Sequence, residues 1–534
     1  MVLDREKVAK YHENHKRTGG YPCTAVAPKN MALTPMLTCL RINSLNPTGV
    51  TMQPDYTSIQ TPYINVINDG QIEEIIQAAY LILERTGVKI THPEALKLLK
   101  EAGAYVNGDR VRMPRWLVQN ALAVVPKGMC IYDRDGRPAM DLGNGKSYYG
   151  SATASPNNID ARTGERHPTT LKDIAEGALI ADALPNIDFV MPFGTAQDIP
   201  AKAGDVHEFV TLMGITTKPV VFCGYSGKGV EKVLEMAALV AGGKEELRRK
   251  PFVVPYPEPI TPLHFSDEVV LRMFACCDFG IPQISCGAQM LGQTSPATLA
   301  GGLALATAES FFSIALSQLR RAGSPCFLTA AIVAVNQKIG SNCVSSPETC
   351  LAIAAQAQIG RKLGLPTWGL AGSADAKVID AQAGVEATMS VLMNAMAGVS
   401  VIHDVGYVDS CMSCSAAMMV IGDEIISWTK RMMAGLEVSA ETMALEAIEQ
   451  VGPGGNFLAN KHTVKHFRKE SWFPTIFRRD KYDTWMADGA PTCEDAAYKK
   501  VKDILDTHAP KPVSDSVMAD LKKMLVEAEK ELLA

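Results

Sequence analysis

The chain has 534 residues, of which 47% are hydrophobic and 20% charged, as is typical of a soluble globular protein with room for two or three structural units. The formal net charge of −5 argues against nucleic acid as the main partner, since no face has to be basic. The 13 cysteines show no disulfide spacing, which indicates a reducing, cytoplasmic location. No apolar stretch of about 18 residues runs without polar interruption, so no membrane contact is expected.

The first two predicted regions precede the part of the chain in which strands and helices alternate. Residues 1–60 carry Pro, Asn, Thr and Gly without a period, and we interpret them as an irregular N-terminal arm that covers a neighbouring subunit of a homo-oligomer. Residues 61–130 are predicted to form a helical cap with a hairpin. Its first helix begins after Asn68 or Asp69, and Asn107 followed by Gly108 indicates the hairpin turn.

Residues 131–435 alternate short apolar runs with helices. The runs do not alternate with polar residues, which is the pattern of buried parallel strands. Eight strand–helix units predict an α/β protein with a (β/α)8 TIM barrel. A doubly wound open sheet is the alternative, but it would need fewer strands and usually a glycine-rich phosphate turn, which the sequence lacks. The predicted strands are 148–150, 188–193, 219–224, 252–256, 283–286, 326–329, 367–370 and 399–403.

Helices are expected between and after these strands, and residues 436–534 are predicted to form a charged C-terminal helical extension. The barrel helices are predicted at about 170–184, 203–214, 228–241, 266–279, 295–322, 347–364, 380–397 and 415–434.

In a barrel of this kind the active site lies at the C-terminal ends of the strands. Aromatic residues recur there although they make up only 6% of the chain. They predict a pocket that holds a cation, best a quaternary ammonium, over ring faces; the alternative is packing at the top of the barrel. The predicted substrate-binding aromatics are Tyr149, Phe193, Tyr225, Tyr256, Trp368 and Tyr407. Polar residues in the same positions are Glu258, Gln289, Asn336, Asp375, Lys377 and Asp404.

His403 ends the eighth predicted strand. It is the candidate anchor for an anionic group of the substrate, or a base, and the alternative is a core histidine bonded to a backbone carbonyl. Cys411 and Cys414 form a C-x-x-C pair close to it. These three residues have the chemistry of zinc ligands, but one C-x-x-C without a second pair is a weak signal, and no tightly bound metal is expected.

Three motifs, in this order, carry a family resemblance. They are GQTSPATLAG at 292–301, SADAKVIDAQAGVEATMSVLMNAMAGVSVIHDVGYVD at 373–409 and EQVGPGGNFLANKHTVKHFRKESWFP at 449–474. They resemble the trimethylamine methyltransferase superfamily from about residue 65 to about residue 505. The resemblance implies a barrel enzyme that moves a methyl group from a methylated amine to the cobalt of a corrinoid carried by a partner protein.

The archaeal trimethylamine enzymes of that family use pyrrolysine, whereas this sequence contains only the twenty standard residues. It therefore resembles the bacterial branch without pyrrolysine, whose members demethylate glycine betaine, proline betaine, carnitine and similar quaternary amines. Such an amine leaves as a neutral molecule, so no general acid and no catalytic side chain is assigned; Co(I) of the corrinoid (cobalamin type) is the nucleophile, and a dry pocket favours its attack on a cation. His403 would bind the substrate's carboxylate.

Three other functions stay open at the level of the sequence. The first is a zinc-dependent corrinoid methyltransferase with His403, Cys411 and Cys414 as ligands. The second is a trimethylamine methyltransferase. The third is a non-catalytic protein that binds quaternary amines on the same scaffold.

Overall fold

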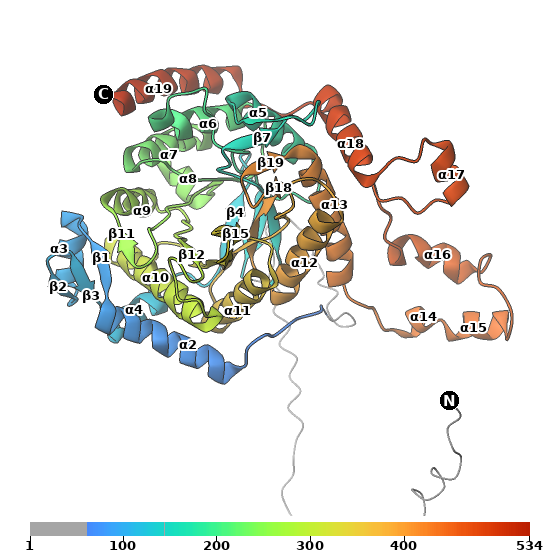
Figure 1. Ribbon diagram of the computed structural model, residues 1–534, viewed down its shortest axis with the longest axis horizontal. Helices are drawn as coiled ribbons and strands as arrows, with labels where there is room; N and C mark the ends of the chain where they lie inside the picture. The colour runs from blue at the N-terminus through green and yellow to red at the C-terminus, as the bar shows by residue number, and fades with distance from the viewer. Residues whose placement is uncertain (1–60, 144) are drawn as a thin grey trace, which may run out of the picture. The chain divides into compact units, whose positions relative to one another are not determined.

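The computed structural model describes residues 61–143 and 145–534; the predicted N-terminal arm lies outside them. One half of a ring of parallel strands, which helices surround in Figure 1, comes from four regular neighbours. β6 (Tyr148–Ser151), the first strand of the ring, pairs with the last, β17 (Val401–Val405). β17 pairs with β16 (Thr367–Leu370), and β16 pairs with β13 (Leu328–Thr329).

The other half of the ring contains β9 (Val220–Phe222) and β10 (Val253–Pro255), which pair in parallel. Bridges from Phe189 to Gly150 and from Val190 to Val220 place a second strand between β6 and β9.

A fifth strand closes the gap between β10 and β13. Ile284 N donates to Pro255 O at 3.1 Å, and Gln283 bridges to Cys326. The ring is therefore complete, and the predicted (β/α)8 barrel is confirmed. The second and fifth strands consist of single bridges where longer strands were expected. Pro192 has no N–H with which to extend the ladder of the second strand.

Eight helices surround the ring in the predicted order. The longest, α10, is long and apolar enough to cross a membrane, but most of its apolar stretch is buried within the protein. A short α8 (Lys244–Arg249) was not expected from the sequence. The eight helices are α5 (Leu171–Ala183), α6 (Gly204–Met213), α7 (Gly227–Ala241), α9 (Asp267–Phe279), α10 (Leu299–Arg320), α11 (Pro347–Leu363), α12 (Ala381–Ala397) and α13 (Ala416–Met433).

The N-terminal part folds as a small helical unit against α10. Its helices α2 (Asp69–Leu81) and α4 (Arg115–Val124) pack on α10. The expected hairpin around Asn107 forms from β2 and β3, and β11 from the barrel joins their sheet in the order β11-β1-β3-β2. The remaining elements of this part are the π-helical turn Ile82–Thr86, β1 (Val88–Ile90), α3 (Pro93–Glu101), β2 (Tyr105–Asn107), β3 (Arg110–Arg112) and β11 (His264–Phe265).

Further short strands lie outside the ring and form hairpins and small sheets. β7 and β8 form a hairpin, which extends into a sheet with the order β18-β19-β7-β8. These added strands are β4 (Met129–Tyr132), β5 (Pro138–Leu142), β7 (Asn157–Ile159), β8 (Arg166–Pro168), β12 (Ala288–Met290), β14 (Ala331–Asn336), β15 (Ser341–Cys343), β18 (Tyr407–Val408) and β19 (Ser413–Ser415).

The C-terminal part returns to the barrel in two long helices. α18 (Cys493–Thr507) packs against α13 and α5, and α19 (Asp515–Leu533) packs against α6 and α7. Within the expected helical extension, the helix over residues 440–451 is broken at Ala444, whose φ of 53° ends α14 and starts α15. Between α13 and α18 lie α14 (Ala440–Met443), α15 (Leu445–Val451), α16 (Lys461–Glu470) and α17 (Tyr482–Ala487).

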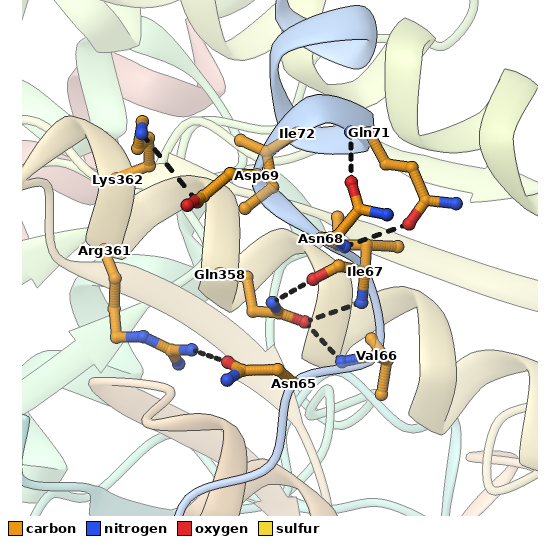
Figure 2. Close-up of a pocket in the computed structure, with 10 residues that line it drawn as sticks. All are labelled: Asn65, Val66, Ile67, Asn68, Asp69, Gln71, Ile72, Gln358, Arg361 and Lys362. Atoms are coloured by element: carbon orange, nitrogen blue, oxygen red, sulfur yellow. Dashed lines mark hydrogen bonds and ion pairs between the residues drawn. The ribbon is translucent and has the colours of Figure 1, made fainter. Parts of the chain in front are cut away.

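An extended strap before α2 is tied to the outside of the barrel (Figure 2). The Gln358 side chain on α11 accepts from Val66 N at 2.6 Å and Ile67 N at 3.1 Å, and it donates to Ile67 O at 2.7 Å. Arg361 donates to Asn65 Oδ1 at 2.9 Å. The pocket of 720 Å³ beside this strap is thus built around structural hydrogen bonds, and we assign it to anchoring the N-terminal unit.

The strap gives a first prediction. Gln358→Leu should lower the free energy of unfolding by about 2–3 kcal/mol, because two strap N–H groups lose their acceptor. Urea denaturation measures the loss. Gln119→Leu, on the exposed face of α4, is the matched control and should change stability by less than about 0.5 kcal/mol. Equal effects of the two substitutions would contradict the anchoring role.

Candidate active site

Four rings from four strands of the barrel meet one another. Trp368 of β16 stacks on His403 of β17, with ring centroids 4.3 Å apart and planes 16° apart. The Tyr256 ring, just after β10, meets Trp368 edge-on at 5.5 Å and lies 6.2 Å from His403. Phe189 lies 6.0 Å from Trp368. We call these four residues the ring cluster.

The ring cluster lies inside the barrel. Trp368 belongs to the seventh strand, whereas Phe189 and Tyr256 belong to the second and fourth, which are not its neighbours in the ring. Side chains from non-adjacent strands meet only across the interior of a barrel. Because Trp368 pairs with Val401 and Leu370 pairs with His403, the His403 ring is one layer closer to the C-terminal end, where barrel enzymes act.

Two nitrogen atoms of the ring cluster have neither a hydrogen-bond partner nor an ion-pair contact among the described residues. Trp368 Nε1 and His403 Nε2 are buried and unpaired among the described residues. An indole N–H is a donor only, and buried donors without acceptors are rare because each costs free energy. The two atoms therefore mark a place where an acceptor from outside the chain would be stabilised.

Asp404 follows His403 with an unusual backbone conformation. Its φ of 86° is in the left-handed region, which costs free energy for a residue with a Cβ and is often found at functional sites. Its carboxylate Oδ1 lies 2.5 Å from His403 Nδ1, although the contact lacks hydrogen-bond alignment. Both side chains are buried, so an imidazole and a carboxyl group are in contact in a buried position next to the ring cluster.

Two partly solvated side chains lie near this pair. Cys223 and Glu258 keep contact with solvent, although burial is the main cause that raises the pKa of each. We call the area around these two residues the recess. Arg272 and then His403 act on Glu258 in the opposite direction and lower its pKa, so Glu258 is close to both of these side chains.

More acidic groups lie on α6 at the same end of the barrel. Tyr225 Oη donates to Glu208 Oε1 at 3.0 Å, and burial raises the pKa of Glu208 to about 8. Burial also raises the pKa of Asp205 to about 6, although its Oδ2 accepts from Tyr225 N at 3.2 Å. A protonated Glu208 carries no charge, so the negative potential here comes mainly from the other carboxylates.

The loop that carries Glu258 is held in place by a buried carboxylate on α10. Glu309 Oε1 accepts from Thr261 Oγ1 at 2.9 Å and from Leu263 N at 2.6 Å. Its other oxygen accepts from Gln289 Nε2 at 2.6 Å. Burial raises the pKa of Glu309. These contacts fix one wall of the recess.

Comparisons with known proteins place the chain in a family. The family model described as trimethylamine methyltransferase (MTTB) matches residues 43–532. The chain is 30% identical over 478 residues to a glycine betaine methyltransferase of Desulfitobacterium hafniense strain Y51, covering 88% of this chain and 98% of that protein. It is 32% identical over 475 residues to a trimethylamine methyltransferase of Methanosarcina barkeri, covering 88% and 96%.

The chain belongs to the trimethylamine methyltransferase family. The resemblance drawn from the three sequence motifs is thereby confirmed, and so is the expected enzyme class, an amine methyltransferase. A crystal structure of the Methanosarcina barkeri monomethylamine methyltransferase aligns with a TM-score of 0.47 at 12% identity, over 81% of this chain and 92% of that one.

Only some of the predicted site residues of this family member belong to the ring cluster. They are His403, Trp368 and Tyr256. Phe189 was not predicted, because it lies inside an expected strand and not after it; the inward-facing positions of that strand are the signal that would have found it. Tyr149, Phe193, Tyr225 and Tyr407 make no ring contact with the cluster among residues 61–143 and 145–534.

Those four aromatics have other neighbours. Tyr225 Oη donates to Glu208 Oε1, as described above. The Tyr149 ring is 5.8 Å from Lys430 Nζ near the end of α13, and the Phe193 ring lies against the backbone of Gly177 and Gly406. Tyr407 Oη accepts from Thr153 N at 3.1 Å.

The zinc-ligand alternative has no matching geometry. In the described part of the chain, no group of three or more His, Cys, Asp or Glu side chains is arranged to hold a metal ion. Burial raises the pKa of both Cys411 and Cys414, and the Asp404 carboxylate adds to the effect. Both are therefore thiols in the absence of a metal ion.

The buried acid on α6 gives a prediction about pH. Glu208 binds its proton more tightly in the folded chain, so its contribution to stability is complete below its ordinary pKa of 4.5 and is lost as pH rises through about 8. The wild-type free energy of unfolding should fall by about 1.4 kcal/mol per pH unit from this group between about pH 5 and pH 7.5.

Glu208→Gln should remove that part of the slope, as measured by urea unfolding at several pH values across this window. Glu231→Gln, on the exposed face of α7, is the control and should keep the wild-type slope. A Glu208→Gln variant with an unchanged slope would contradict the burial of a neutral acid.

Proposed function

We propose that this family member moves one methyl group from a quaternary amine with a carboxylate, such as glycine betaine or a similar betaine, to the Co(I) of a corrinoid carried by a partner protein. The observation that supports this substrate class is the pair of unpaired buried nitrogens, Trp368 Nε1 and His403 Nε2. A betaine carboxylate would supply the acceptor that the donor of Trp368 lacks.

The ring cluster suits the other end of such a substrate. A quaternary ammonium donates no ordinary hydrogen bond and is held best over aromatic faces, and the rings of Tyr256 and Trp368 are available for that contact. His403 in its imidazolium form carries a proton on both nitrogens. One proton would face Asp404 and the other the substrate's carboxylate.

The surroundings of the ring cluster also fit a corrinoid that arrives from outside. The recess keeps solvent contact at Cys223, Tyr225 and Glu258, so a cofactor carried by another protein could approach the substrate on that side. The bound corrinoid would supply the nucleophile. The chain's own residues would hold the amine, aim one methyl group at the recess and exclude water. Since a neutral tertiary amine leaves, no general acid is assigned.

A second candidate is a methylated amine without a carboxylate, such as trimethylamine. The carboxylates of Glu258 and Asp404 beside the ring cluster favour a bare cation. Sequence identity does not separate the two candidates, since the glycine betaine and trimethylamine relatives are 30% and 32% identical to this chain. The cytoplasmic location and the homo-oligomer remain predictions.

A substrate panel tests the proposal. The full chain is incubated with Co(I) cobalamin and, in turn, glycine betaine, proline betaine, carnitine, choline and trimethylamine, and methylation of the cobalt is followed by its absorbance. Fastest turnover of a betaine supports the proposal, whereas turnover of trimethylamine alone supports the second candidate. Betaine binding in calorimetry without methylation, even with added corrinoid proteins, would indicate the non-catalytic binding protein.

The indole donor gives a sharper prediction. Trp368→Phe keeps an aromatic ring but removes the N–H, so the KM for the betaine should rise by about 10-fold or more, the value of one hydrogen bond to a charged group. The KM for choline, which has no carboxylate, should change much less. Steady-state kinetics on both substrates measure the difference.

Trp116→Phe, at an exposed position of α4, is the matched control and should leave both KM values unchanged. Equal effects of Trp368→Phe on betaine and choline would remove the indole N–H from carboxylate binding.

Metal removal distinguishes the zinc alternative. Dialysis of the full chain against a chelator should leave methyl transfer unchanged, and Cys414→Ser should keep the wild-type kcat, because His403, Cys411 and Cys414 are not expected to act as ligands. Elemental analysis that finds about one zinc per chain, lost together with activity, would favour the alternative.

A further inference from the structure

The segment that joins α13 to α18 carries an unusual amount of exposed apolar surface. We call residues 435–491 the connecting segment. Helices α14, α16 and α17 contain no buried residue, and α15 contains only Ala447. Twelve of the 29 exposed large hydrophobic side chains of the described chain lie in this segment, which has no core of its own to hold them. They are Leu436, Val438, Met443, Leu445, Ile448, Phe457, Leu458, Val464, Phe467, Phe473, Tyr482 and Met486.

The polar faces of the connecting segment pair with one another. Lys469 Nζ on α16 lies 2.7 Å from Glu437 Oε2. Lys465 and His466, also on α16, contact Glu441 on α14. These ion pairs join α16 to the stretch around α14. Exposed ion pairs contribute little to stability, and α14 to α17 make no extended packing contact with another described element. Trp472 stacks on Trp428 of α13, and Thr475 N donates to Glu424 of α13, so this end of the segment is held by its own chain. The order of α14, α15 and α16 therefore needs apolar contacts from elsewhere.

The same chain has an exposed apolar groove on the outside of the barrel. It runs between α12 and α13, has a volume of 660 Å³ and is closed at one side by Phe477 and the start of α18. Val385, Met389 and Trp428 in its wall are 62%, 49% and 43% exposed. We call it the α12–α13 groove. Its contiguous apolar wall is the kind of surface that a protein partner covers.

The charges of the groove and of the connecting segment are complementary. Asp380 and Glu494 line the groove, and the pKa of Glu494 is raised by burial and by the nearby Asp495, so Glu494 has a like charge beside it. α16 has the sequence KHTVKHFRKE, in which Lys461 and Arg468 take part in no ion pair among the described residues. Cations from α16 would thus neutralise the rim of the groove.

A second copy of this chain is the partner that fits both surfaces. Each copy offers one connecting segment and one α12–α13 groove, so a two-fold axis lets two copies satisfy both at once. Permanent homodimer interfaces are richer in apolar side chains than the rest of the surface, whereas transient interfaces are not. A corrinoid protein that must arrive and leave would make the second kind of contact.

We propose that the chain forms a dimer in which the connecting segment of one copy packs its apolar side chains into the α12–α13 groove of the other. The exchange is reciprocal. It buries the faces of α15 and α16 that the chain leaves exposed, and it leaves the recess next to His403 unchanged.

Sedimentation and native mass spectrometry of the full chain test the proposal. The wild type should be a dimer or an assembly of dimers. Two double substitutions, Leu445→Glu with Ile448→Glu in the segment and Val385→Glu with Met389→Glu in the groove, should each give monomers with unchanged circular dichroism. Val526→Glu, an exposed apolar position on α19, is the control and should keep the wild-type mass.

Mixing the two monomeric variants decides whether segment and groove bind each other. The mixture should contain heterodimers, because one intact segment then meets one intact groove. A monomeric wild type would overturn the proposal. So would a groove variant that stays dimeric while the segment variant is monomeric, since the segments would then bind one another. A segment variant that keeps its mass but no longer reacts with a corrinoid protein would show that the segment serves that partner, and would also overturn it.

Discussion

The contact between the first and the last strand of the barrel determines where everything else lies. β6 and β17 are separated by about half of the chain, yet Tyr148 pairs with Val401 and Ser151 with Val405. This pairing turns an open sheet into a ring and gives it an interior. Without it, Trp368 and Phe189 would lie on the same face of a sheet but far apart. The ring cluster therefore forms because the barrel closes, and no single sequence motif specifies it.

In and around that ring the dominant physical effect is desolvation. It raises the pKa of Cys411, Glu208 and Glu309, and Trp368 Nε1 and His403 Nε2 are buried without a hydrogen-bond partner among the described residues. Each of these groups would be inexpensive to keep on an outer surface and is costly in a buried position. Under the proposed function, a ligand with its own acceptor and its own positive charge would complete these contacts.

Much of the architecture was predictable because its signals are local. Apolar runs without alternation predicted the barrel strands, and turn residues such as Asn107 with Gly108 predicted a hairpin. The break at Pro192 was visible in the sequence but was not used, so the second strand was predicted too long. The break at Ala444 had no signal, because alanine rarely adopts a positive φ.

The site was only partly predictable because it depends on which strands face each other across the ring. The rule that active sites follow the strands found His403 and Tyr256. It also selected Tyr149 and Phe193, whose side chains pack elsewhere, since position along a strand does not say whether a ring points inward. Phe189 was missed for the opposite reason: it sits within a strand and points to the interior. Glu309, which holds the loop at Thr261 and Leu263, lies on a helix. A rule that considers only the ends of strands does not find it.

The position of Glu309 on α10 links two parts of the molecule that are distant in sequence. One side of α10 receives α2 and α4 of the N-terminal unit, and the Glu309 side chain holds the loop at Thr261 and Leu263. A shift of α10 within its packing would therefore move this loop along with it. Under the proposed function, changes in the sequence of the N-terminal unit would act on the choice of amine through this one helix.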